Sequence, residues 1–188
     1  MKKELTKNFN IYSYDIETYQ GLKYLSCISK LTTDNLQNVT KNQIINAKSK
    51  FFRYEMEDNE FFKQLIKNNK YSVVFIHNLK FEYEFIKNLE FINHCSLTMI
   101  GDSDSSIKSL ICKYGKNTLK FIDTLLITNK SIKTIGEEND FPKLDYNYSI
   151  ERYWNTELTQ LDYDYNRYDT IIAFLGFFNK IKQYPDCI

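Results

Sequence analysis

Apolar and aromatic side chains dominate residues 10–19, where they surround two acids, Asp15 and Glu17. A short run of β-branched and aromatic residues is typical of a buried β-strand. Side chains two positions apart in a strand project from the same face, so both carboxylates are expected to point the same way. Residues 24–30 alternate well enough to predict a second strand, whereas the polar, Asn-rich residues 31–50 predict a solvated loop or edge.

The middle of the chain predicts a helix, a strand and a second helix. Apolar residues recur at helical spacing over residues 58–69, and Asp58 is the expected N-cap. The continuous apolar run at residues 72–76 suits a central strand that is buried on both faces. A helical stripe follows, with Asn78 as its expected N-cap and Glu82 in its first turn.

The second half of the chain predicts a hairpin and a long helix. Residues 107–114 and 118–123 alternate around a Gly-containing turn, which indicates a β-hairpin. Residues 124–157 carry Gly and Pro breakers and predict a short helix plus an irregular segment, with Trp154 covering the core. Residues 158–181 predict a long buried helix, in which Asp169 lies one turn after Tyr165. The earlier acids of this helix, Asp162 and Asp164, are interpreted as solvated.

Length, composition and charge limit the possible classes of protein. At 188 residues the chain is long enough for one domain with a sizeable core, and its 43% apolar content excludes a disordered segment. A net charge of +1 excludes duplex binding by bulk electrostatics, so any contact with nucleic acid must be local. The scattered cysteines favour neither a zinc site nor a disulfide scaffold: Cys27, Cys95, Cys112 and Cys187.

No segment of the sequence predicts export or a membrane span. Residues 1–8 lack the apolar core of a secretory signal, and the longest apolar run, residues 171–178, is too short to cross a bilayer. A cytoplasmic, reducing setting without a membrane partner is therefore the expectation.

The paired acids of the first strand suggest metal chemistry. Two neighbouring carboxylates on a buried strand repel each other and are costly to desolvate. A divalent cation between Asp15 and Glu17 removes both costs, because Mg²⁺ and Mn²⁺ prefer hard oxygen ligands. Glu82 is expected at the carboxyl end of the central strand, where open α/β sheets place their ligands. The alternatives are a solvated strand end for the pair and, for Glu82, an ordinary acid favoured by the helix N-terminus.

Five short motifs, in order, now carry a resemblance. The chain is similar to the 3′→5′ exonuclease domain of family B DNA polymerases in its Asp15-Ile-Glu17, its Asn78-Leu-Lys-Phe-Glu82 and its Tyr165-x-x-x-Asp169. The phrase from Phe75 to Phe81 resembles the protein-primed branch found in phages and linear plasmids. So do two further motifs, Asp123-Thr-Leu125 and Lys143-Leu-Asp-Tyr146. The resemblance spans residues 10–181.

The resemblance implies a fold, an activity and roles for particular residues. The implied fold is α/β, a ribonuclease H-like (DnaQ-like exonuclease) mixed sheet flanked by helices. The implied activity is proofreading-type hydrolysis of single-stranded DNA 3′ ends with two Mg²⁺ or Mn²⁺ ions, held by Asp15, Glu17, Glu82 and Asp169. Tyr165 would orient the attacking water and Lys143 would offset charge at the scissile phosphate. The 3′ end would be held by Thr18, Asn78, Phe81, Thr124 and Leu125, with Phe81 against the terminal bases.

The resemblance also sets expectations for the chain's context. The polymerase palm and its aspartates are absent, so residues 1–188 are expected to be a single exonuclease-like domain, either excised or free-standing. A polymerase domain or a terminal protein is the expected partner, and a phage or plasmid the expected source.

One residue departs from the family pattern and keeps alternatives open. The second motif of the family ends in Asp, whereas this chain has Glu82, whose carboxylate is displaced by more than the ~0.5 Å tolerated in a catalytic shell. The first alternative is a weakened or inactive module that binds single-stranded nucleic acid or a replication partner. The second alternative is a structural domain with surface acids, for which divalent ions would produce no thermal shift.

Overall fold

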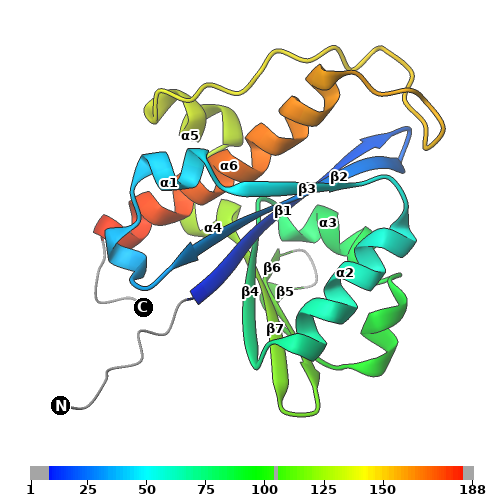
Figure 1. Cartoon of the computed structure of the whole chain (residues 1–188), viewed down its shortest axis with the longest axis vertical. Helices are drawn as coiled ribbons and strands as arrows, with labels where there is room; N and C mark the ends of the chain where they lie inside the picture. Colours follow the sequence, from blue (N-terminus) through cyan, green and yellow to red (C-terminus); the bar gives the residue numbers. More distant parts are fainter. Residues whose placement is uncertain (1–8, 104–105, 184–188) are drawn as a thin grey trace.

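A computed structural model describes residues 9–103 and 106–183. In these two ranges one mixed sheet has the strand order β3-β2-β1-β4-β7-β6-β5 (Figure 1). Its strands are β1 Phe9–Tyr19, β2 Leu22–Thr33, β3 Lys48–Phe52, β4 Tyr71–Ile76, β5 Ser96–Ser103, β6 Ser106–Tyr114 and β7 Asn117–Asp123. β4 lies between β1 and β7 and runs parallel to both, while the remaining neighbours are antiparallel. Residues 1–8 and Cys187, on which sequence predictions were made, lie outside the described ranges.

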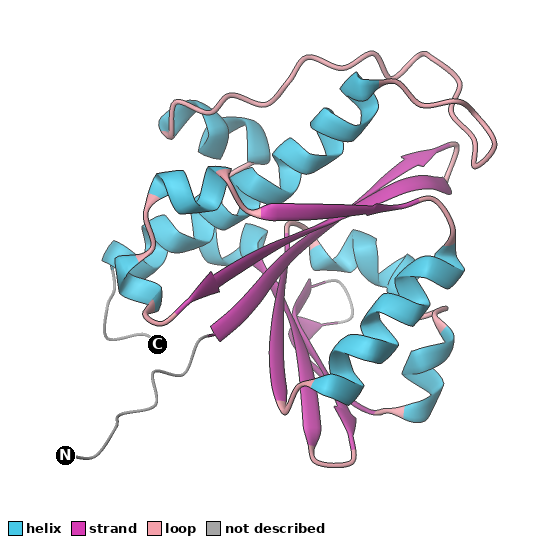
Figure 2. Cartoon of the chain, viewed as in Figure 1, coloured by secondary structure: helices cyan, strands magenta, loops and turns pink. Residues whose placement is uncertain are grey.

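Helices cover both faces of this sheet. α2 and α3 lie on one face, and the long α6 lies on the other together with α1, α4 and α5 (Figures 1 and 2). The bounds are η1 Leu36–Asn38, α1 Lys41–Ile45, α2 Glu55–Asn68, α3 Leu79–Ile86, η2 Glu90–His94, α4 Thr124–Thr128, α5 Ile132–Glu138 and α6 Gln160–Gln183. The predicted α/β class, hairpin and long last helix are confirmed. No helix in the described part of the chain is long and apolar enough to cross a bilayer.

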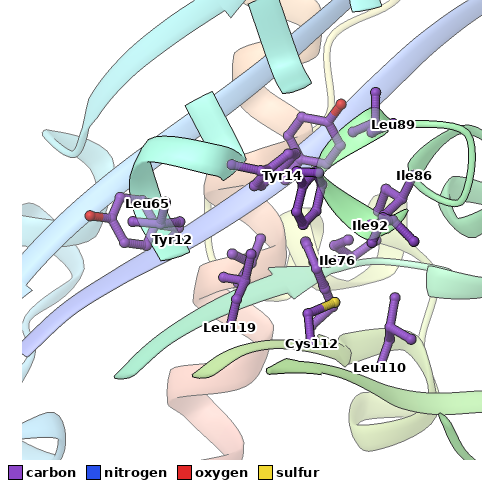
Figure 3. Packing of buried hydrophobic residues seen from close by; sticks show 14 of the residues in the cluster. Tyr12, Tyr14, Leu65, Ile76, Ile86, Leu89, Ile92, Leu110, Cys112 and Leu119 are labelled. Carbon is purple, nitrogen blue, oxygen red and sulfur yellow. The ribbon is translucent and has the colours of Figure 1, made fainter. Parts of the chain in front are cut away.

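The alternation along β1 divides the protein into two cores. Tyr12, Tyr14 and Ile16 pack toward α2 and α3, in a cluster that Figure 3 shows from close by. Ile11 packs instead in the cluster beneath α6. The positions between the aromatic residues therefore face α6, and Asp15 and Glu17 share that face as predicted. The helices are held to the sheet by burial of the apolar side chains in these two clusters. Each Å² of apolar surface removed from water contributes about 25 cal/mol.

β1 continues beyond the end of its parallel neighbour. Pairing between β1 and β4 ends at Tyr14 opposite Ile76, so the next residues of β1 lie beside the chain that enters α3. The register with β2 shifts between Glu17 and Thr18, which marks a β-bulge. Acids at this edge therefore lie where strands end and helices begin, the usual place for ligands in an open α/β sheet.

The structure corrects three local predictions. Asp58 is not an N-cap, because α2 begins at Glu55 and Asp58 is buried within it. There it accepts hydrogen bonds from Tyr14 and Ser26 and pairs with Lys23. Residues 31–50 are not one solvated loop, since they contain the end of β2, α1 and the start of the edge strand β3. Trp154 does not cover the core, because it is 60% exposed.

Candidate metal and nucleic-acid site

Three acids from two elements meet at this edge of the sheet. Asp15 and Glu17 of β1 and Asp169 of α6 each offer a carboxylate oxygen, and these oxygens lie within 4.8 Å of one another. Glu17 and Asp169 are buried and Asp15 is half-buried. Among the described residues, this is the group of acids, histidines and cysteines that could hold a metal ion. Of the four predicted metal ligands, three are therefore brought together.

The electrostatics of the three acids favour a cation. Burial, followed by repulsion from Glu17 and Asp169, raises the pKa of Asp15 well above its usual range. Burial and the nearby Asp169 raise the pKa of Glu17 to about 8. Burial also raises the pKa of Asp169, against the opposing Lys143 ammonium, and Asp169 Oδ1 is buried without a hydrogen-bond partner. Such carboxylates fit a divalent ion, because positive charge relieves both repulsion and desolvation.

Glu82 lies beside this group without belonging to it. It occupies the first turn of α3, is 3% exposed, and accepts a hydrogen bond from the backbone N–H of Ile16. Its Oε2 atom is buried and has no hydrogen-bond partner. Burial, and then repulsion from Glu17, raises its pKa well above the usual range. Glu84, by contrast, is exposed and pairs with Lys87.

Lys143 and Tyr165 form the wall of the site on the α6 side. The Lys143 ammonium donates to Asp169 Oδ2 at 2.6 Å and lies 4.5 Å from the centre of the Tyr165 ring. Tyr165 is buried, stacks on Tyr146 with ring centroids 4.1 Å apart, and exchanges a hydroxyl hydrogen bond with Tyr148. Tyr165 and Asp169 therefore lie on one side of α6, as predicted, and Lys143 contacts both.

The residues predicted to bind the DNA strand differ in how far they are exposed. Thr18 is half-buried and follows the bulge after Glu17. Asn78 is exposed and Phe81 is 43% exposed, both at the start of α3. Asn78 stands at the N-cap position, but it has φ +75° and makes no side-chain cap, which corrects its predicted capping role.

Thr124 and Leu125 are less exposed than Asn78 and Phe81. Thr124 is fully buried, and its hydroxyl donates to the Ile76 carbonyl and contacts His77 Nδ1 at 3.1 Å. Leu125 is half-buried. The Thr124 side chain therefore contacts the turn that leads from β4 into α3.

The sequence did not predict the capping role of Asp123 or the contact made by Asn166. The carboxylate of Asp123 accepts from the backbone N–H of Leu79 at 2.8 Å and of Leu126 at 3.1 Å, so it caps both α3 and α4. An acid directly before a helix was an available signal for the second cap only. Asn166 donates to Asp15 Oδ2 at 2.6 Å, across 151 positions of sequence, and no local pattern indicates such a contact.

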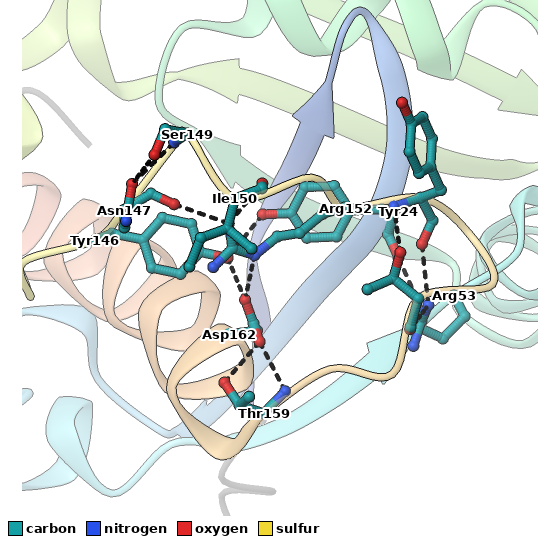
Figure 4. A network of polar contacts seen from close by, with 11 residues as sticks. Tyr24, Arg53, Tyr146, Asn147, Ser149, Ile150, Arg152, Thr159 and Asp162 are labelled. Carbon is teal, nitrogen blue, oxygen red and sulfur yellow. Dashed lines mark hydrogen bonds and ion pairs between the residues drawn. The ribbon is translucent and has the colours of Figure 1, made fainter.

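The segment between α5 and α6 carries Lys143 and Tyr148 and is tied down at two points. Asp162, predicted to be solvated, is 3% exposed and accepts from the Arg152 guanidinium at 2.6 Å, from Thr159 and from Tyr146 (Figure 4). Burial alone would raise the pKa of Asp162, but these hydrogen bonds lower it to about 2. Arg53 forms the second tie by donating to the carbonyls of residues 153, 154 and 156.

Comparison with known proteins supports the fold. No protein-family model matches the sequence, and no curated protein does. Solved structures of Phi29 DNA polymerase do match. The ternary complex with primer-template DNA and incoming nucleotides has a TM-score of 0.71, 18% identity, and coverage of 95% of this chain. The orthorhombic crystal form has a TM-score of 0.72 and 18% identity over 95% of this chain. The complex with single-stranded DNA gives 0.71 at 19% identity over 93% of this chain.

These matches cover only 32% of the length of the polymerase chains. At this level of identity they establish the fold. The predicted ribonuclease H-like sheet, and the likeness to a phage polymerase of the protein-primed branch, are therefore confirmed at the level of the fold.

Proposed function

We propose that this chain is a metal-dependent 3′→5′ exonuclease that hydrolyses the 3′ ends of single-stranded DNA. The observation that carries the proposal is the group formed by Asp15, Glu17 and Asp169, whose oxygens lie within 4.8 Å in a largely buried setting. Buried carboxylates that repel one another need a counter-charge, and hard divalent cations supply it. Two Mg²⁺ or Mn²⁺ ions are the proposed cofactors, with Glu82 as the fourth acid.

The side chains divide the work of phosphodiester hydrolysis between them. Divalent ions, when bound, would supply a stronger nucleophile and charge stabilisation for the attacking and leaving oxygens. Lys143 is held by Asp169 at the edge of the group, where its ammonium would offset charge on the scissile phosphate. Tyr165 would orient the attacking water through its hydroxyl, which Tyr148 holds at present.

The proposed substrate is an unpaired strand, because the chain lacks the charge that a duplex ligand would require. Net charge is +1, so binding would rest on a few local contacts. Phe81 is exposed at the start of α3, and base stacking on such an aromatic ring contributes about 1–3 kcal/mol per base. Thr18 is half-buried and Asn78 is exposed, and both would hold the sugar-phosphate backbone.

The decisive experiment follows a 5′-labelled single-stranded oligonucleotide with Mg²⁺ or Mn²⁺, in the presence and absence of chelator. The proposal expects a ladder that shortens from the 3′ end and disappears with chelator. Asp15→Asn and Asp169→Asn should abolish it, because each removes one charge from the group. Asp164→Asn is the matched control, since Asp164 lies on the same helix outside the acidic group and accepts a hydrogen bond from Gln160. A ladder that survives in Asp15→Asn would mean a contaminating nuclease and refute the assignment.

A second function is favoured by Glu82, which lies outside the group of three acids. If Glu82 cannot support catalysis, the chain is a module that binds single-stranded nucleic acid or a replication partner without cleaving it. This function predicts retention of a fluorescent single strand without any ladder in either metal ion. Cleavage that appears only in Glu82→Asp would then assign the wild-type chain to the binding class.

The proposed context is the replication of DNA inside a cell. A polymerase domain or a terminal protein is the proposed partner, because the matching polymerase chains extend well beyond the part that this chain resembles. Co-purification of such a partner with the tagged chain, lost when the exposed residues of α3 are changed, would support this assignment. A chain that purifies alone from its native source would oppose it.

A further inference from the structure

A buried amide lies directly behind the acidic group. Asn166 of α6 is fully buried, and its Nδ2 donates to Asp15 Oδ2 at 2.6 Å. The same amide stabilises the charged form of the Glu17 carboxylate by a hydrogen bond. One side chain of α6 therefore contacts both acids of β1, while Asp169, three residues later, adds the third acid.

We propose that Asn166 is a positioning residue, which fixes the Asp15 carboxylate so that the acidic group can bind its cation. This inference rests on the proposed function, because it concerns the same metal site. The carboxylate of an aspartate can rotate about its terminal bond, and a hydrogen bond to one oxygen restricts that rotation. With Oδ2 held by Asn166, the remaining oxygen keeps a defined direction.

The other half of the amide shows that this arrangement has a cost. Asn166 Oδ1 is buried and has no hydrogen-bond partner. A buried unpaired acceptor destabilises a protein by about 1–3 kcal/mol. Reversing the amide would place its carbonyl oxygen against the ionised Asp15 carboxylate. Both groups are hydrogen-bond acceptors, so no hydrogen bond could form between them. The amide is therefore oriented to donate to Asp15. An apolar residue of the same shape would fill the same space in the core without leaving an unpaired acceptor.

The same face of α6 supplies a control one turn away. Thr170 is as buried as Asn166, and its hydroxyl bonds Ser29 at 2.6 Å. Ser29 in turn contacts Ser49 at 2.8 Å, so this contact joins α6 to β2 and β3 without touching an acid. A change at Thr170 therefore perturbs the packing of α6 to a similar degree but leaves Asp15 alone.

The test measures Mn²⁺ binding directly, by the loss of the free-ion paramagnetic resonance signal, with no nucleic acid present. Asn166→Leu keeps the shape of the side chain and removes the donor, and it should weaken Mn²⁺ binding by about 10- to 100-fold, as loss of an outer-sphere partner usually does. Thr170→Val should bind Mn²⁺ as the wild type does. In the cleavage assay, Asn166→Leu should need correspondingly more Mn²⁺ for half-maximal rate and recover most of the rate at saturation.

The outcomes separate this inference from the proposed function. Wild-type protein that binds no Mn²⁺ would refute both. Wild-type binding that Asn166→Leu leaves within twofold would refute the positioning role alone. If Asn166→Leu does not fold, Asn166→Ala and Asn166→Asp provide the same comparison. Asn166→Ala should show the same weakened binding, whereas tighter binding in Asn166→Asp with no loss in Asn166→Ala would make residue 166 a potential ligand and overturn the proposal.

Discussion

Neutralising Glu17 should stabilise the metal-free protein while weakening its response to metal. Glu17 is 8% exposed and shares its site with Asp15 and Asp169, so its negative charge is opposed by burial and by like charges. Glu17→Gln keeps the size of the side chain and removes the charge. A residue placed for folding would show the reverse behaviour, because its loss would destabilise the chain.

The sign and size of the effect follow from the shifted pKa. Burial and Asp169 raise the pKa of Glu17 from 4.5 to about 8, so the folded state keeps a proton that the unfolded state has already released. Between these pH values unfolding releases a proton, and the free energy of unfolding of the wild type falls as pH rises. At 1.36 kcal/mol per pKa unit the full penalty is about 5 kcal/mol above pH 8. In the variant the neighbouring acids ionise more easily, which offsets part of this difference. We therefore expect the free energy of unfolding of Glu17→Gln to exceed that of the wild type by about 2–5 kcal/mol above pH 8.

The assay is urea-induced and thermal unfolding at pH 5 and pH 8.5, with chelator or with Mg²⁺. The gain of Glu17→Gln over the wild type should be near zero at pH 5 and largest at pH 8.5, where the melting temperature should rise by about 5–15 °C. Mg²⁺ should stabilise the wild type through binding to the folded state and should stabilise the variant less. Glu84→Gln is the control, since Glu84 is exposed and its change should stay below about 0.5 kcal/mol. A gain that is equal at both pH values, or a loss at pH 8.5, would refute the reasoning.

Three further predictions concern neighbouring groups. Burial lowers the pKa of His77 from 6.5 to about 4, so its contribution to stability is present above pH 6.5 and is lost as pH falls toward 4. We expect the free energy of unfolding to fall by about 2–3 kcal/mol over that range in the wild type and to change less in His77→Gln. NMR titration of the His77 ring in the wild type would measure its pKa. Asp162→Asn should cost about 3–5 kcal/mol, because it leaves the buried Arg152 without its partner. Limited proteolysis should then cut residues 146–156 faster, and unchanged cleavage would show that Arg53 alone holds the segment. Glu82→Asp should lose the hydrogen bond from Ile16 and cost about 1–3 kcal/mol. Faster hydrogen exchange at the Ile16 amide would report that loss, and unchanged exchange would refute it.

The parts of the fold that periodicity controls were predictable. The alternation at residues 10–19 defines a strand with Tyr14 and Ile16 on one face and the acids on the other, and the structure has this arrangement. The continuous run at residues 72–76 became the central strand β4 for the same reason. Errors occurred where a tertiary contact outweighs local preference. Asp58 resembles a cap in sequence, yet Lys23 and Ser26 make a place for it inside α2.

The candidate site was predictable from its acids but not from the groups that support them. Asp15, Glu17 and Asp169 could be found because their positions within buried segments are unusual for charged residues. Asn166 could not be found in this way, since a buried asparagine in a helix has no local signature and its partner lies 151 positions away. Asp162 was misjudged for a related reason, because its partner Arg152 lies in an irregular segment that no periodicity describes.

The extra methylene of Glu82 has a structural explanation at the end of β4. Parallel pairing stops at Tyr14 opposite Ile76, so the strand that would face Ile16 is missing. Glu82 replaces it, because its carboxylate takes the hydrogen bond of the Ile16 N–H while α3 remains packed on the sheet. An aspartate at this position would be one methylene shorter, so its carboxylate would lie farther from the Ile16 N–H. Glu82 therefore lies beside the strand that carries Asp15 and Glu17, with its Oε2 atom buried and without a hydrogen-bond partner.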